Sequence, residues 1–268
     1  MNLISSPYGD GMDPEEYELC IQDAMEFFNI SREEAASKMR GSQLFKEHLD
    51  KGESLDFIYD NTDAVIWDLL TVKATVSSGI KERYREKVVK NILNKYGTHN
   101  LSFVMDYGCG IGREALVAVN EGYYVDGVDR GQTIKFADFY INKQAAFPNN
   151  WKAIKSSDFI PISYDIIMCF EYFEHENDPE ELVTKFRNIL TDDGLLICNS
   201  RSFNAHDTGH LEHNFKYQYE FEKIIAAAGF ECIYFPYNPP NLYNIAVWKK
   251  VDKANSYYNG FTTEKGEW

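Results

Sequence analysis

The stretch Asp106-Tyr-Gly-Cys-Gly-Ile-Gly112 decides the fold of this chain. It follows a short apolar run and precedes a helical pattern, so we interpret it as a strand-to-helix turn whose glycines let the backbone pass close to a ligand. The dinucleotide fingerprint GxGxxG would require glycine at position 113, where this chain has Arg113. The acid before the turn would repel a phosphate but suits a cationic amino-acid ligand. The turn therefore predicts a cradle for such a ligand.

The pattern around this turn alternates short apolar strands with helices, which predicts a doubly wound α/β sheet. The last two strands flank Asn238-Pro-Pro-Asn241, which is too short for a helical crossover, so they should form an antiparallel hairpin at the sheet edge. The expected strands are 102–106, 123–128, 151–155, 164–170, 194–199, 231–235 and 243–249, and the expected helices are 112–121, 131–146, 179–190 and 217–228.

The first 97 residues show helical patterns without strand alternation. Asp13-Pro14 supplies an N-cap and a first-turn proline, and Ser31-Arg-Glu-Glu34 is a capping box. Further helices are expected over 63–72 and along the apolar stripe of residues 80–92. The domain organisation that we predict is a helical cap over 1–97, an α/β domain over 98–252 and a flexible tail over 253–268.

Composition narrows the class of protein. The 268 residues are 44% hydrophobic, which is ample for a packed core. The net charge of −15 argues against nucleic acid as a partner, because nucleic-acid affinity depends on Lys and Arg neutralising phosphates. No long apolar run or signal peptide is evident, so we expect a soluble, cytoplasmic protein without a membrane partner. The five scattered cysteines are expected to be reduced, buried thiols.

Further acidic residues follow the later strands, at the carboxyl edge where open α/β sheets bind ligands. Asp129 ends the second strand and can accept both hydroxyl protons of a ribose. Asp158 and Phe159 follow the third strand and can offer a carboxylate to an adenine amine and a ring to its face. Glu171-Tyr-Phe-Glu-His175 closes the fourth strand. Together with the glycine turn, these positions predict a cofactor site.

The chain resembles the class I S-adenosylmethionine-dependent methyltransferases over residues 100–250, and within them an uncharacterised group with a helical N-terminal extension. The resemblance implies a Rossmann-like sheet of seven strands that ends in the antiparallel hairpin. The motifs that carry the resemblance, in chain order, are Val104–Gly112, Gly127-Val-Asp129, Asp165–His175 with Asp178-Pro179, Leu190-Thr-Asp-Asp-Gly194 and Ala228-Gly-Phe-Glu231; those shared with the group are Phe57–Leu69 and Phe136–Asn142.

The resemblance also implies the cofactor, S-adenosyl-L-methionine, with S-adenosyl-L-homocysteine as the product. Asp106 and the backbone of the glycine turn would hold the methionine portion, Asp129 the ribose, Asp158 and Phe159 the adenine, and Glu171 the wall beneath the sulfonium. This chain departs from many relatives at Arg130, where Ser or Thr commonly follows the second-strand acid. The expected cofactor-binding residues are Asp106, Gly108, Cys109, Gly110, Asp129, Arg130, Asp158, Phe159 and Glu171.

Methyl transfer needs a positioned nucleophile, and a base only where the nucleophile must lose a proton. Candidates for the base lie in Glu174-His175 and in the segment His206-Asp-Thr-Gly-His-Leu-Glu-His213. That segment also has residue types that suit zinc or iron, but no cysteine ligands accompany them, and we expect no metal. The expected catalytic residues are His210, His213 and His175, and the expected acceptor-binding residues are Tyr59, Trp67, His206 and Tyr237.

The sequence therefore predicts an enzyme that transfers a methyl group to an O, N or C atom of a small-molecule acceptor. Three alternatives stay open. The first is a methyltransferase acting on a sugar or glycan precursor or on a protein side chain; an enclosed pocket would favour a metabolite, and an open groove a macromolecule. A catalytically silent binding module would keep the fold without turnover, and a nicotinamide-dependent reductase would bind NAD. The pattern does not predict the oligomeric state.

Overall fold

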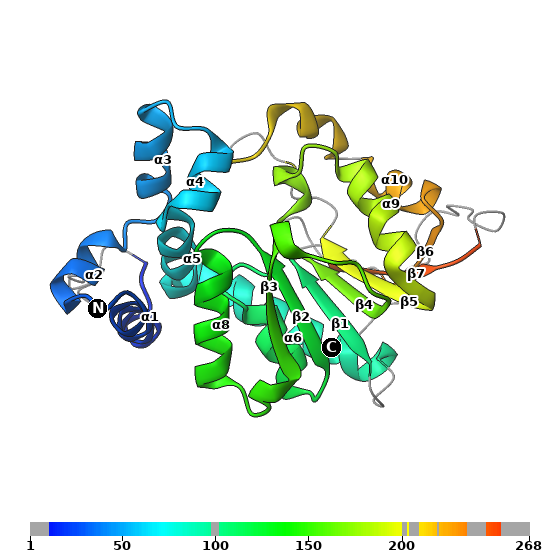
Figure 1. Ribbon diagram of the computed structural model, residues 1–268, viewed down its shortest axis with the longest axis horizontal. Helices are drawn as coiled ribbons and strands as arrows, with labels where there is room; N and C mark the ends of the chain where they lie inside the picture. The colour runs from blue at the N-terminus through cyan, green and yellow to red at the C-terminus, as the bar shows by residue number, and fades with distance from the viewer. Residues whose placement is uncertain are drawn as a thin grey trace, which may run out of the picture.

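A mixed seven-stranded sheet lies at the centre of the molecule, with helices on both of its faces (Figure 1). The computed structural model describes residues 11–97, 102–199, 203, 209–218, 220–234 and 245–252, with the backbone alone for 76–84. The strand order is β3-β2-β1-β4-β5-β7-β6. The strands are β1 (Phe103–Tyr107), β2 (Tyr124–Asp129), β3 (Trp151–Lys155), β4 (Tyr164–Cys169), β5 (Leu190–Asn199), β6 (Phe230–Tyr234) and β7 (Ile245–Lys250).

The direction of the strands confirms the predicted sheet. Strands β1 to β5 pair in parallel, and β7 runs antiparallel to both β5 and β6. The predicted hairpin therefore exists as the antiparallel pair β6 and β7. Strand β7 lies between β5 and β6, and β6 forms the edge of the sheet. The turn of the hairpin, Asn238–Asn241, lies outside the described residues. Strand β5 begins at Leu190 and not at the expected residue 194, because Leu190 pairs with Tyr164 of β4.

The two faces of the sheet are covered by two different groups of helices because successive strand residues point to opposite sides. Val104 of β1 and Ile166 of β4 belong to one apolar cluster, which also includes residues of α6, α7 and α8. Met105 and Ile167, their neighbours in the chain, belong to a second cluster with α9 and α10. These helices are α6 (Val76–Tyr96), α7 (Arg113–Asn120), α8 (Thr133–Gln144), α9 (Pro179–Ile189) and α10 (Phe221–Ala227).

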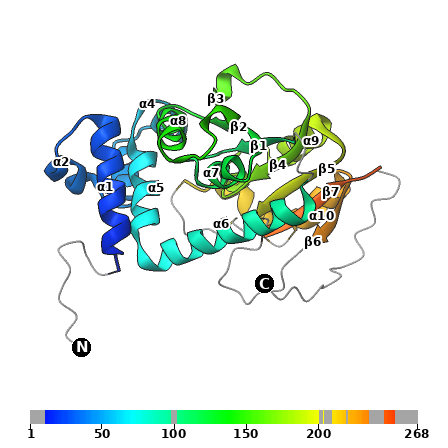
Figure 2. The same ribbon diagram turned by 90° about the horizontal axis from the view of Figure 1, so that it is seen from below.

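The N-terminal helices form a group at one end of the sheet, from which α6 runs along the sheet beneath α7 (Figure 2). The predicted caps are present, since Asp13 accepts amide protons at the start of α1 and Ser31 accepts the N–H of Glu34 at 3.1 Å. The expected division at residue 97 stays a prediction, and the tail from residue 253 lies outside the described part. The helices are α1 (Pro14–Phe28), α2 (Arg32–Lys38), α3 (Gln43–Asp50), α4 (Leu55–Asn61) and α5 (Ala64–Ala74).

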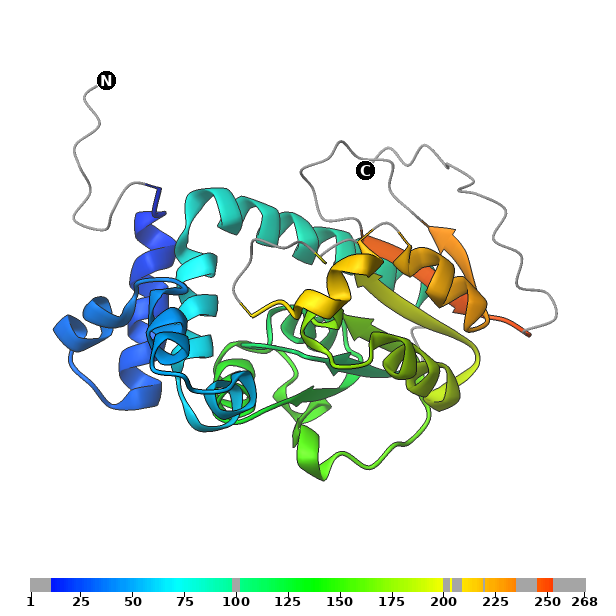
Figure 3. The same ribbon diagram turned by 90° about the horizontal axis from the view of Figure 1, so that it is seen from above.

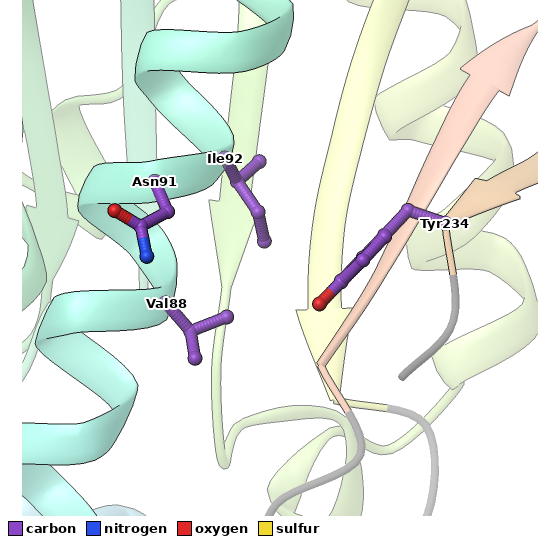
Figure 4. Close-up of a pocket in the computed structure, with 4 residues that line it drawn as sticks. All are labelled: Val88, Asn91, Ile92 and Tyr234. Atoms are coloured by element: carbon purple, nitrogen blue, oxygen red, sulfur yellow. The ribbon is translucent and has the colours of Figure 1, made fainter. Parts of the chain in front are cut away.

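One small pocket lies between α6 and the end of β6 and contains about 150 Å³ of empty space, which includes open solvent (Figure 4). Its lining consists of Val88, Asn91, Ile92 and Tyr234. None of the residues expected to bind a cofactor or an acceptor lines it, so this pocket is not the candidate site. Among the helices of the described residues, none is long and apolar enough to cross a membrane.

Candidate active site

The glycine turn between β1 and α7 has the backbone conformation that its sequence requires. Gly108, Gly110 and Gly112 have φ angles of 72°, 54° and 84°, in the left-handed region that glycine adopts without steric cost. A Cβ atom on Gly108 would lie 2.2 Å from the ring of Tyr172, so any other residue here would also collide with a side chain. Cys109 is buried, and burial holds the pKa of its thiol well above its usual range, so the side chain is an unreactive packing group.

The amides of this turn are largely used within the protein. The N–H of Gly108, for example, donates to the carbonyl of Val128 at 2.8 Å. A phosphate cradle needs free N–H groups. With these amides paired, the carboxylate oxygens of Asp106 and Asp129 are the polar groups near this turn. They suit a ligand that donates hydrogen bonds, and they would repel a pyrophosphate. The turn amides that are paired in this way are those of Gly108, Cys109, Gly110 and Gly112.

Asp106, the acid that precedes the turn, is buried at the end of β1. It is 2% exposed, and its Oδ2 atom has no hydrogen-bond partner among the described residues. Burial raises the pKa of this carboxyl well above its usual range, and the nearby carboxylate of Glu114 raises it further. A cationic partner would stabilise such a group. The ammonium group of a methionine-type ligand is a cation of this kind, so Asp106 fits the expected cofactor.

Asp129, at the end of β2, is held by backbone amides from two loops. Its Oδ2 atom accepts the N–H of Gly110 at 2.7 Å, and its Oδ1 atom accepts the N–H of Arg130 at 2.6 Å. Burial raises the pKa of this carboxyl to about 6. Each oxygen keeps a further lone pair, so the carboxylate can still accept hydroxyl protons, as a ribose site requires.

The side chain of Arg130 connects the loop after β2 to the N-terminal cap. Its guanidinium pairs with Asp56 at 2.9 Å and with Asp60 at 2.8 Å, both on α4. The contact continues at Gly131, where a Cβ atom would lie 2.2 Å from the carbonyl oxygen of Tyr59. Helix α4 therefore lies directly on the loop that follows Asp129, and the Arg130 side chain anchors it there.

The two residues expected at the adenine follow β3, as predicted. Asp158 is exposed, and its Oδ1 accepts a hydrogen bond from Ser157 at 3.0 Å. Phe159 is half-buried, with its ring edge-on to Tyr107 at a centroid distance of 6.4 Å. The Phe159 ring thus lies beside the end of β1, and the Asp158 carboxylate precedes it in the chain. Their role in holding adenine stays a prediction.

Glu171, which follows β4, has a strained backbone that the sequence pattern did not reveal. Its φ of 48° is rare for a residue other than glycine. Asn199, at the end of β5, accepts the N–H of Glu171 at 2.8 Å, and its side-chain amide donates to the Glu171 carboxylate. Strain of this kind gathers at functional sites, where the surrounding structure enforces it. Asn199 was not singled out because an asparagine at a strand end is common.

Glu174, His175 and His210 come together near the same edge and are termed the Glu-His-His cluster. The rings of His175 and His210 contact each other edge to face at 4.9 Å between centroids, and His210 Nε2 lies 3.8 Å from Glu174 Oε1. Tyr59 of α4 reaches the cluster, with its hydroxyl 3.3 Å from His175 Nδ1. Figures 1 and 3 show α4 close to the segment that begins at residue 209.

The other expected residues have different surroundings. His213 is exposed, and its Nε2 donates to the carbonyl of Asn177 at 3.1 Å. Trp67 is fully buried in the cap, stacked on Phe28 at 5.0 Å between centroids, an environment that supports a packing role. His206 and Tyr237 lie outside the described residues. Of the expected acceptor-side residues, the structure thus brings together Tyr59, His175 and His210.

Comparison with known proteins assigns the family. Residues 81–234, more than half of the chain, match the family model described as a methyltransferase domain. A putative methyltransferase from Geobacillus sp. (strain WCH70) is 25% identical over 140 residues, 49% of this chain and 53% of that protein. A ubiquinone biosynthesis O-methyltransferase from Neisseria meningitidis serogroup C is 27% identical over 138 residues, 47% of this chain and 58% of that protein. The chain thus spans little more than half of the curated relatives it matches.

Solved structures support the fold. Magnesium protoporphyrin IX methyltransferase from Synechocystis PCC 6803, crystallised with S-adenosylmethionine, superposes with a TM-score of 0.55 at 16% identity and covers 73% of this chain and 94% of its own. This likeness confirms the predicted fold class, a Rossmann-like sheet with a C-terminal antiparallel pair. The family uses S-adenosylmethionine as its methyl donor, in agreement with the cofactor expected from the sequence. The chain belongs to the methyltransferase-domain family, the class I S-adenosylmethionine-dependent methyltransferases.

Proposed function

We propose that this chain transfers the methyl group of S-adenosylmethionine to an oxygen or nitrogen atom of a small-molecule acceptor. The observation that carries the proposal is that two carboxylates, the buried Asp106 and the half-buried Asp129, lie at the ends of neighbouring strands, at the edge where the Glu-His-His cluster also lies. When bound, the cofactor supplies a methyl group on a positively charged sulfur.

Different residues of the chain bind different parts of the cofactor. Asp106 takes the ammonium group, because it is a buried acceptor with an unpaired oxygen. Asp129 takes the ribose hydroxyls, because backbone amides already fix the orientation of its carboxylate. Glu171 forms the wall beside the sulfur, in the position that Asn199 imposes on it. Fixed oxygen atoms of this kind orient the cofactor without reorganising during the reaction.

The Glu-His-His cluster acts on the acceptor. An oxygen or nitrogen nucleophile that carries a proton must lose it for stable methyl transfer, and imidazole groups are suited to assist this near neutral pH. The Nδ1–H of His175 donates to the carbonyl of Gly209 at 2.9 Å, which leaves Nε2 of the same ring with its lone pair. The cluster therefore presents a basic atom on the acceptor side.

The position of α4 supports a small acceptor over a macromolecular one. Helix α4 is anchored to the cofactor loop by Arg130, and its Tyr59 contacts His175. Burial holds the pKa of the Tyr59 hydroxyl above its usual range, so this group is a neutral hydrogen-bonding phenol at the cluster. A site covered by a helix and a phenol ring favours an enclosed acceptor.

The test is a screen of small hydroxyl- and amine-bearing metabolites for S-adenosylhomocysteine formation, followed by variants. With an acceptor found, His210→Ala should lower the turnover number by about a hundredfold or more. Its binding of S-adenosylhomocysteine should not change. The control is His48→Ala. His48 lies on α3, outside the cluster, and pairs with Glu53 at 2.6 Å. Unaltered turnover in His210→Ala would remove the cluster from the mechanism, and methylation of protein or glycan substrates alone would refute the small acceptor.

A further inference from the structure

We infer that the Glu-His-His cluster is a binding site for a divalent transition-metal ion. Glu174, His175 and His210 each offer one ligand atom, and these atoms all lie within 4.8 Å of one another. The sequence suggested metal ligands only within 206–213 and gave no reason to combine them with strand four. The folded chain uses one histidine of that segment, His210, and adds two residues that follow β4.

The donor set selects the class of ion. Two imidazole nitrogens and one carboxylate suit zinc, iron or manganese, whereas calcium and magnesium prefer oxygen ligands alone. His210 Nε2 and Glu174 Oε1 are 3.8 Å apart, which is too long for a hydrogen bond. Two ligands that each lie about 2.1 Å from one ion are separated by roughly 3–3.5 Å, so the three side chains would move closer together when they bind an ion.

The ring orientation of His175 matches that of metal-bound histidines. Because the carbonyl of Gly209 can only accept, the contact at 2.9 Å places a proton on Nδ1, so in the neutral ring Nε2 is the nitrogen able to bind a metal. Histidines that bind metals usually donate their other ring N–H to a carboxylate or a backbone carbonyl in this way, which fixes the tautomer.

The backbone around the cluster is held in place by buried hydrogen bonds. Asn214 is fully buried, and its amide donates to the carbonyls of Glu176 at 2.7 Å and of Glu174 at 3.3 Å. The N–H of Leu211, next to His210, donates to the Glu174 carbonyl at 3.0 Å. These bonds tie the two ligand-bearing segments together. Glu174 itself is 1% exposed, and a carboxylate at that depth is stabilised by a cation.

This inference deepens the proposed function and rests on it for the use of the ion, although the binding itself does not. Three protein ligands leave at least one coordination position open, as in catalytic zinc sites. With the ion bound, the imidazole lone pairs are used in coordination, so the ion replaces the imidazole base of the proposed function. An acceptor hydroxyl bound to the ion would lose its proton at a lower pH than in water. The acceptor class that this site fits is therefore an alcohol or phenol oxygen.

The test uses the full-length chain without an affinity tag, stripped with a chelator and titrated with Co²⁺, whose visible absorption reports nitrogen and oxygen ligands. We expect one Co²⁺ per chain, displaced by Zn²⁺. His210→Ala and Glu174→Gln should each weaken Co²⁺ binding by about tenfold or more. His48→Ala, which removes a histidine from another carboxylate pair, should bind Co²⁺ like the unaltered chain.

Binding of S-adenosylhomocysteine, measured on the same samples, separates the two hypotheses and shows that each variant is folded. Absence of stoichiometric Co²⁺ binding in the unaltered chain would overturn the metal site while leaving the methyltransferase proposal intact. Binding in both cluster variants that equals binding in the unaltered chain would do the same. If the unaltered chain does not bind S-adenosylhomocysteine, the proposed function is instead refuted. The titration of the unaltered chain decides the inference even if a variant fails to fold.

Discussion

Asp129 shows how burial and hydrogen bonding compete at a single residue. Its carboxylate accepts two backbone N–H groups, which favour the ionised form, yet burial raises its pKa to about 6. Desolvation therefore outweighs the hydrogen bonds. A hydroxyl donor from a ligand would favour the ionised form further, so ligand binding and deprotonation of Asp129 are coupled.

The first prediction concerns this coupling. If Asp129 binds the ribose as proposed, its carboxylate form accepts the hydroxyls, so affinity for S-adenosylhomocysteine should be constant at neutral pH and fall as the pH drops through about 6. The fall attributable to one group is at most about tenfold per pH unit. Calorimetric titrations at several pH values check this, and Asp129→Asn should bind more weakly with a smaller slope. An identical slope in the variant would assign the effect to another group, Asp106 being the nearest candidate.

Two glycines allow the cost of a positive φ angle to be measured separately from the cost of a collision between an added Cβ atom and a neighbouring side chain. Gly108 and Gly122 both have positive φ, 72° and 90°, but an added Cβ meets the Tyr172 ring at 2.2 Å only at Gly108 and meets nothing within 4 Å at Gly122. Each alanine variant should lose roughly 1–2 kcal/mol for the conformation. Gly108→Ala should lose more, along with affinity for S-adenosylhomocysteine. Equal losses in chemical denaturation would contradict the close packing of Tyr172.

At this scale, sequence predicts residues whose chemistry shows in a local pattern. The glycines of the turn, Asp106 and Asp129 are of this kind, because each follows a strand or carries a conformational requirement. Asn199 could not be found, since its role depends on β5 lying beside β4. The anchoring of α4 by Arg130 was also hidden, because the partners Asp56 and Asp60 lie far away in the chain.

Among the secondary-structure elements, helices α6 and α7 are joined by two ion pairs. Arg85 of α6 pairs with Glu114 of α7 at 2.5 Å, and Arg113 pairs back to Glu86 at 2.5 Å. Both side chains of the first pair are 8% exposed. Arg113, the residue that breaks the dinucleotide fingerprint, therefore holds the helix after the glycine turn against α6.

The third prediction tests this buried pair. Arg85 keeps the pKa of Glu114 below its usual range although burial opposes the shift. Glu114 therefore contributes stability above the pKa of the unfolded state, and this is lost as pH falls through the lower folded pKa. Glu114→Gln should lower the free energy of unfolding at pH 7 by about 3 kcal/mol or more.

The control for this measurement is Glu181→Gln, which breaks an exposed pair with Lys185 within α9. Exposed pairs of this type contribute about 0.5 kcal/mol or less. Urea denaturation of both variants compares the two environments directly. A Glu114→Gln loss as small as that of the control would mean that the α6–α7 contact does not depend on its buried ions.

Elements with strong hydrophobic periodicity were predictable, and short ones were not. The strands from β1 to β4 begin and end within a residue or so of their expected limits, because their apolar runs are bounded by turn residues. Helices α3 and α4 were not separately predicted, since each has too few turns for a clear apolar repeat. Helix α4 matters most, because it places Tyr59 at the Glu-His-His cluster.

At the scale of the whole molecule, the sheet brings distant parts of the chain to one edge. Residues after β1, β2 and β4 converge there, and α4 and residues 209–218 contribute from opposite ends of the sequence. This convergence follows from the parallel direction of these strands, which the alternating pattern predicts, and from their order in the sheet, which the structure shows. The contacts of the N-terminal helices depend on long-range packing. The net charge of −15 still argues against nucleic-acid acceptors.

The central claim is that this edge binds the methyl donor through Asp106 and Asp129. Isothermal titration of the full-length chain with S-adenosylhomocysteine tests it most directly, with NADH titrated in parallel. We predict one S-adenosylhomocysteine site per chain, strongly weakened in Asp129→Ala with the fold preserved by circular dichroism, and no NADH binding. Undetectable S-adenosylhomocysteine binding, or unchanged affinity in the folded Asp129→Ala variant, would contradict the claim.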